Sequence, residues 1–141
     1  MLHHSHELPD IELRALLART RTIAVVGLSP SLHRTSHGVS SYMLAQGYRI
    51  IPVNPNATVV FGEKAYPTLT EAARHVPIEL ANVFRRSEDV TPVVDEAIAI
   101  GAPAVWLQLG IRNEEAAAKA RAAGLLVVQD RCIMMEHRRL A

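Results

Sequence analysis

The sequence has few aromatic residues and a single cysteine. Aromatic side chains make up only 4% of the 141 residues, too few for the base-stacking platforms that bind single-stranded nucleic acid. One cysteine, Cys132, excludes an internal disulfide and fits a reducing compartment. A net charge of +1 provides no field that would attract DNA or a membrane surface. We therefore expect neither a nucleic-acid partner nor a membrane partner.

Long hydrophobic runs are also missing. No apolar stretch reaches the roughly 18 residues of a membrane-spanning helix, and the N-terminus, M-L-H-H-S-H, lacks the apolar core of a secretory signal. These absences predict a cytoplasmic protein. The length of 141 residues fits one domain. We expect its core to cover residues 20–140 and residues 1–9 to be disordered.

The sequence does contain a regular alternation of strand-like and helical segments. Apolar runs predict strands at 22–27, 48–53, 78–84, 104–109 and 125–128. Helical spacing is found at 10–20, 39–46, 69–75, 87–101 and 114–123, with a last helix within 130–141 and an irregular connection at 56–67. Such alternation is typical of parallel sheets covered on both faces. We predict the α/β class, as a single Rossmann-like doubly wound domain with a five-stranded parallel sheet in the order 3-2-1-4-5.

The segment from Thr22 to Leu44 contains the strongest functional signal. An apolar strand ends at Gly27, a polar loop follows, and Gly38 begins a predicted helix. In an open parallel sheet, phosphate groups bind at this corner, against backbone N–H groups and the helix dipole. The dinucleotide fingerprint G-x-G-x-x-G is absent, because Ser29 and Leu32 occupy its second and third glycine positions.

Side chains of this loop are suited to phosphate. Arg34 offers paired donors, and Ser29, Thr35 and Ser36 add hydroxyl groups. Further basic residues are expected near the same rim, namely His33, His37, Lys64, Arg85 and Arg86. Coenzyme A, with a pyrophosphate and an additional 3′-phosphate, fits such a rim. For Lys64 and Arg86, ordinary solvated surface charges are an equal alternative.

Two positions argue against NAD. Ser29 replaces the glycine that lets a pyrophosphate approach the backbone, and the second strand ends in V-N-P-N at 53–56, without an acidic residue for the adenosine ribose. No P-loop occurs either. NADP stays open as an alternative, because Arg85 or Arg86 can pair with a 2′-phosphate.

Seven stretches, in order along the chain, point to one family. They are V-V-G-L-S-P at 25–30, R-T-S-H-G-V at 34–39, G-Y-R-I-I-P-V-N-P-N at 47–56, G-E-K-A-Y-P-T-L at 62–69, V-F-R-R-S-E-D-V at 83–90, A-V-W-L-Q-L-G at 104–110 and D-R-C at 130–132. With these stretches the sequence resembles the small stand-alone CoA-binding proteins. That family is related to the CoA-binding domain of succinyl-CoA synthetase alpha chains and of ADP-forming acyl-CoA ligases.

The resemblance implies a Rossmann-like domain that binds coenzyme A across the carboxyl edge of its sheet. It implies three groups of binding residues: a phosphate corner of Gly27, Ser29, Arg34 and Ser36, continued by His37 and Gly38; an adenosine region of Asn54, Pro55 and Lys64; and a wall of Phe84 and Arg85. One departure is Asn82, where the family often has an aspartate.

Cys132 separates two classes of function. It follows the fifth strand beside Arg131, a cation that would favour the thiolate, and the pantetheine arm of a bound CoA is expected to point towards it. The alternative is a buried cysteine that only packs. The sequence thus leaves open a non-catalytic CoA or acyl-CoA module, acting as carrier, sensor or partner of a second copy or an acyl-CoA enzyme, and an acyl-CoA-handling or thiol-redox enzyme.

Histidines outside the rim contribute little to either interpretation. His137 lies in a basic terminal helix, where a surface residue is the usual case. His3, His4 and His6 lack partners at metal-ligand spacing and are interpreted as incidental. We therefore assign no catalytic residue and no metal site.

Overall fold

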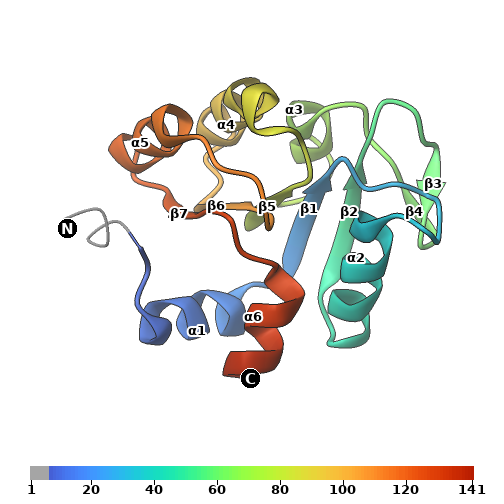
Figure 1. Cartoon of the computed structure of the whole chain (residues 1–141). Helices are drawn as coiled ribbons and strands as arrows, with labels where there is room; N and C mark the ends of the chain where they lie inside the picture. The colour runs from blue at the N-terminus through green and yellow to red at the C-terminus, as the bar shows by residue number, and fades with distance from the viewer. Residues whose placement is uncertain (1–6) are drawn as a thin grey trace.

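The computed structural model describes residues 7–141. Figure 1 shows one layered α/β body. Its elements, in chain order, are α1 (Asp10–Arg19), β1 (Thr22–Val26), α2 (Thr35–Ala45), β2 (Arg49–Val53), β3 (Val59–Val60), β4 (Glu63–Lys64), α3 (Leu69–Ala73), β5 (Leu80–Val83), the 3₁₀ helix η2 (Ser87–Asp89), α4 (Val90–Ala99), β6 (Ala104–Leu107), α5 (Glu114–Ala122), β7 (Leu126–Val128) and α6 (Ile133–Leu140).

The main sheet has five parallel strands in the order β2-β1-β5-β6-β7. The predicted α/β class and five-stranded parallel sheet are thereby confirmed. The order within the sheet differs from the expected 3-2-1-4-5: counted along the chain, it is 2-1-3-4-5. After β2 the chain passes through the β3–β4 hairpin and α3 and re-enters the sheet on the far side of β1. The switch point therefore lies between β1 and β5.

Helices cover both faces of this sheet, with α3, α4 and α5 on one face and α1, α2 and α6 on the other (Figure 1). Successive strand side chains alternate between the two layers, as the pleat requires. In β6, for example, Val105 packs under α4 and α5, and Trp106 packs in the opposite layer. Strands buried on both faces are near-continuous apolar runs, as is typical of doubly wound folds.

Three local features differ from the sequence-based expectations. Helix α2 begins at Thr35 rather than near Val39, so Gly38 lies inside the helix. The connection at 56–67 contains the β3–β4 hairpin. The helix expected over 87–101 begins as the 3₁₀ helix η2, α4 follows it, and Ser87 Oγ accepts a hydrogen bond from Arg112 N (3.0 Å).

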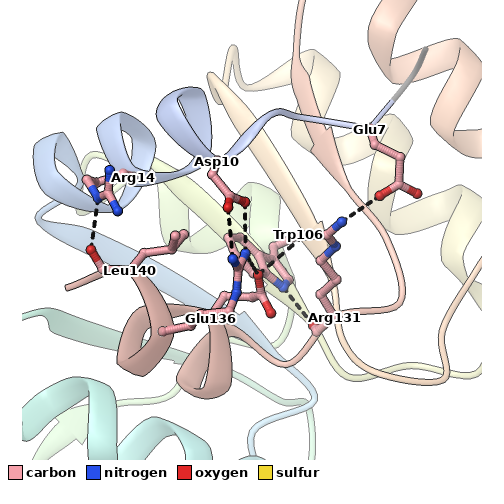
Figure 2. Close-up of polar contacts among 8 residues, drawn as sticks. Glu7, Asp10, Arg14, Trp106, Arg131, Glu136 and Leu140 are labelled. Carbon is pink, nitrogen blue, oxygen red and sulfur yellow. Dashed lines mark hydrogen bonds and ion pairs between the residues drawn. The ribbon is translucent and has the colours of Figure 1, made fainter. Parts of the chain in front are cut away.

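A chain of ion pairs joins the N-terminal segment and α1 to α6 (Figure 2). Glu7 contacts Arg131 (2.6 Å), and Arg131 contacts Glu136 (3.2 Å). Arg139 then joins Glu136 (2.7 Å) to Asp10 (2.9 Å).

These contacts correct part of one expectation. The sequence predicts disorder over residues 1–9, but Glu7 is held by Arg131 and Leu8 packs against the layer of α1, α2 and α6. The rest of that expectation, with His3, His4 and His6, lies outside the described residues. Within residues 7–141, no helix combines the length and apolar character needed to cross a bilayer.

Candidate functional site

A cavity of about 640 Å³ opens at the carboxyl ends of β1, β2 and β5. This volume is within the usual range of small-molecule sites, roughly 300–1,000 Å³. We call it the β1–β5 crevice. It is lined by Gly27, Ser29, Arg34, Thr35, Ser36, Asn54, Asn56, Phe84, Arg85 and Arg86. Seven of the predicted site residues thus lie together: Gly27, Ser29, Arg34, Ser36, Asn54, Phe84 and Arg85.

Gly27 forms the floor of the crevice, where the ends of β1 and β5 meet. Its φ is +91°, and a Cβ at this position would lie 2.3 Å from the Phe84 carbonyl oxygen and 3.0 Å from Arg85 Nη1. Its N–H donates to Val53 O on the other side (2.8 Å). Only glycine fits here, because both the backbone conformation and the space exclude a side chain.

The loop after β1 is held by its own hydroxyl groups. Ser36 Oγ is buried and accepts from Ser29 N (3.0 Å), and Ser29 Oγ accepts from Ser31 N (3.1 Å). The sequence predicted these serines as phosphate partners; the structure shows that their oxygens position the loop. Within residues 7–141, the N–H groups of Thr35 and Ser36 have no acceptor. The first turn of α2 therefore presents backbone donors at the crevice.

The crevice is strongly basic. Arg34 is exposed and Arg85 half-buried, and neither has an ion-pair partner among residues 7–141. Arg86 is the exception, since its Nε lies 3.2 Å from Asp89 Oδ2. No acidic side chain lines the crevice in the described part of the chain. Guanidinium groups without a carboxylate partner are suited to phosphate, which they bind through paired donors.

Asn54 explains why no acidic residue follows β2. Its Nδ2 donates to Leu28 O (2.9 Å), and its Oδ1 accepts from Asn56 N (2.9 Å). The side chain thus joins the loop after β2 to the loop after β1. An ionised aspartate could not donate the first bond, so the position at which an NAD site would need a carboxylate is occupied by a structural amide.

Five predicted site residues do not line the crevice. His37 lies on the first turn of α2 and contacts Phe61 with its ring, and Gly38 is exposed on the same helix. Pro55 is exposed between two lining residues. Lys64 is exposed on β4, with its Nζ 5.3 Å from the centre of the Tyr66 ring. Three further residues line the crevice. Thr35 and Arg86 were predicted near this rim from their hydroxyl group and charge, but the family resemblance did not include them among its binding residues. Asn56 was not predicted.

Cys132, the fifth of these residues, is buried and only 7% exposed. It directly precedes α6 and packs in the layer of α1, α2 and α6. The neighbouring Arg131 directs its guanidinium to Glu7 and Glu136 (Figure 2). The structure therefore places Cys132 away from the crevice lining.

Asn82, the departure noted in the sequence, lies on β5 and is 1% exposed. Its Nδ2 donates to Trp106 O (3.4 Å) and to Gln108 Oε1 (3.3 Å). Gln108 Oε1 also accepts from Ile133 N (2.9 Å). This amide pair joins β5 and β6 to the start of α6. The sequence predicts no role for Gln108, because a lone glutamine in an apolar strand gives no signal.

Comparisons with known proteins agree with this architecture. The chain is 44% identical over 126 residues to the Bacillus subtilis (strain 168) protein YneT, covering 89% of this chain and 92% of that protein. The structure of a Thermus thermophilus protein described as cell-free ID.343 superposes with a TM-score of 0.90 at 40% identity, covering 95% of this chain and 100% of that chain.

A more distant likeness shows the fold alone. The apo form of dinucleotide-forming acetyl-coenzyme A synthetase 1 from Ca. Korarchaeum cryptofilum has a TM-score of 0.66 at 23% identity, covering 90% of this chain and 27% of that chain. The decisive match is to the family model described as CoA binding domain, over residues 21–138. Since this match includes the whole sheet and every residue of the crevice, the chain belongs to the CoA-binding domain family.

Proposed function

We propose that the protein binds coenzyme A or an acyl-CoA in the β1–β5 crevice, as a non-catalytic carrier, sensor or partner module. One observation carries the proposal: within residues 7–141, Arg34, Arg85 and the first turn of α2 surround a crevice without any acidic side chain. A polyanion is the ligand class that such a site favours. Coenzyme A has three phosphate groups, and the family of the chain agrees with this choice.

The crevice residues fit this ligand. Gly27 lets the end of β5 approach the floor of the crevice, because a Cβ there would meet the Phe84 carbonyl oxygen. Thr35 and Ser36 supply N–H donors, and Arg34 and Arg85 supply charge. Asn54 forms part of the wall without adding a negative charge. In this proposal these groups hold the pyrophosphate and the 3′-phosphate.

A non-catalytic role is supported by the position of Cys132. The one thiol of the chain is buried outside the crevice, so the enzyme alternative lacks an exposed nucleophile at this residue. The free thiol also supports the cytoplasmic location that forms part of the proposal. NADP stays a competing ligand to be tested, because Arg85 and Arg86 line the crevice.

The test is thermal unfolding with CoA, acetyl-CoA, ATP, NAD and NADP at matched concentrations. A ligand at one hundred times its dissociation constant adds about 2.7 kcal/mol, which raises the midpoint of a domain of this size by about 8 °C. We expect this shift with CoA or acetyl-CoA and a smaller shift with ATP. Stabilisation by NADP or NAD alone would contradict the proposal. Incubation with acetyl-CoA, followed for release of free thiol, tests the non-catalytic part, and no turnover is expected.

A further inference from the structure

The edge strand β7 has one side without a neighbouring strand. In its pairing with β6, the N–H of Leu126 donates to Pro103 O (3.0 Å). Main-chain groups of successive strand residues point to opposite sides, so the N–H and C=O of Val127 point to the open side. Within residues 7–141 neither group has a partner, although Val127 is only 3% exposed. Buried main-chain groups are nearly always paired, so these two are available to a ligand.

Two adjoining cavities follow this open side, between β7 and the segment before α1. Their volumes are about 110 and 280 Å³, and both are lined by Glu7, Leu8, Arg121 and Val127. We call the two together the β7 groove. It extends from Leu125 to Gln129, about 13 Å of strand, and the wall of its smaller cavity includes the apolar Leu13 and Val128. The groove therefore has the length of about four residues of an extended chain.

Two arginines hold a carboxylate at one end of the β7 groove. Glu7 Oε1 lies 2.6 Å from Arg131 Nη2, and Glu7 Oε2 lies 3.7 Å from Arg112 Nη2 (Figure 2 shows the first contact). Arg131 also contacts Glu136 (3.2 Å), and Arg112 contacts Glu114 (3.5 Å). These further contacts position the two guanidinium groups. The Glu7 carboxylate thus occupies a site that is suited to a carboxylate from elsewhere.

We propose that the β7 groove binds the C-terminal end of an extended peptide, whose terminal carboxylate replaces Glu7 between Arg112 and Arg131. The peptide backbone pairs with the N–H and C=O of Val127, and an apolar last side chain enters the smaller cavity. Arg131 follows the carboxyl end of β7, so the peptide runs parallel to β7, as the other strands of the sheet do. A simple carboxylic acid would use only the arginines and leave Val127 unpaired. The inference does not depend on coenzyme A.

The test uses acetyl-Ala-Val-Ala-Leu with a free C-terminal carboxylate, and the same peptide as its C-terminal amide. Titrations at millimolar concentrations are followed by the NMR shifts of main-chain amides, and we expect the acid to move the Val127 amide. Glu7→Gln should raise the affinity of the acid about threefold to fivefold, because an exposed ion pair excludes a competitor by no more than that. Glu115→Gln, an exposed residue of α5 with the same charge change, is the matched control and should bind as the wild type does.

A second variant tests the main-chain contact. Val127→Pro removes the outward N–H at an edge position, where proline is tolerated, and in the Glu7→Gln background it should abolish binding of the acid. Thermal unfolding shows whether this variant folds, and if it does not, the Glu7→Gln titration decides alone. No binding of the acid to Glu7→Gln, or equal binding of acid and amide, would overturn the inference. Acetate that binds as tightly as the peptide would also overturn it, since the groove would then hold a simple anion.

Discussion

At the scale of single residues, two glycines in the same stretch should respond in opposite ways to alanine. Gly27→Ala forces a side chain into a left-handed conformation, at a cost of about 1–3 kcal/mol, and overlaps the Phe84 carbonyl oxygen. Gly38 lies inside α2, and a methyl group added there would meet no atom within 4 Å. Gly38→Ala should therefore stabilise the protein by about 0.5–1 kcal/mol. Urea unfolding measures the stability of both variants. If Gly27→Ala left the free energy of unfolding unchanged, the close contact with the Phe84 carbonyl oxygen would be contradicted.

Arg34 is the second residue with a sharp expectation. Arg34→Ala should weaken CoA binding by about 1.5–3 kcal/mol, because a charge-assisted hydrogen bond is lost. The fold should be unaffected, since the side chain is exposed and has no partner within residues 7–141. Calorimetry of the variant gives the affinity. Arg74→Ala, at an exposed arginine on the surface near α3, is the control with the same charge change. Equal affinities of both variants would exclude Arg34 from the site.

Cys132 distinguishes the module from an enzyme. Because the side chain is buried, we expect CoA disulfide to form a mixed disulfide with it slowly in the folded protein and rapidly in urea. Mass spectrometry would detect one added CoA, absent in Cys132→Ser. Rapid modification of the folded protein would show an accessible thiol and would favour the enzyme alternative.

At the scale of elements, the attachment of α6 to α1 should depend on pH. The hydrogen bond from the Arg139 guanidinium lowers the pKa of Asp10 below its ordinary value of 3.8. A lowered carboxyl pKa stabilises the fold above that ordinary value, and the contribution is lost as the pH falls through the folded-state pKa. A double-mutant cycle of Asp10→Asn and Arg139→Gln should show coupling at pH 6 that disappears in strong acid. Both side chains are exposed, so added salt should also weaken the coupling between Asp10 and Arg139. Coupling that persists in acid would contradict this origin.

Elements differ in how far the sequence predicts them. The buried strands and the helices α1, α4 and α5 follow from apolar spacing, which the core layers select directly. The β3–β4 hairpin does not, because its strands have two residues each and Phe61-Gly62 is not a usual turn pair. The predicted start of α2 is wrong for a related reason. Its first residues, Thr35 to Gly38, are polar or small, and the crevice rather than the core determines their position.

At the scale of the whole molecule, strand order is the main feature that the sequence does not predict. Alternating strands and helices predict parallel strands but not the side on which a strand joins the sheet, so 3-2-1-4-5 and 2-1-3-4-5 have the same local pattern. The observed order matters for the site. It places β5 beside β1, and Arg85 next to Gly27. In the predicted order, strand 3 would have been at the edge, away from this loop.

The close approach of the Phe84 carbonyl oxygen to Gly27 also has a genetic consequence. The atom that a side chain at position 27 would strike is a main-chain oxygen, which every amino acid at position 84 would carry. No exchange of the Phe84 side chain can therefore make room for it. A screen for suppressors of Gly27→Ala should return reversion to glycine and changes that strengthen the fold elsewhere, but no compensating allele at codon 84.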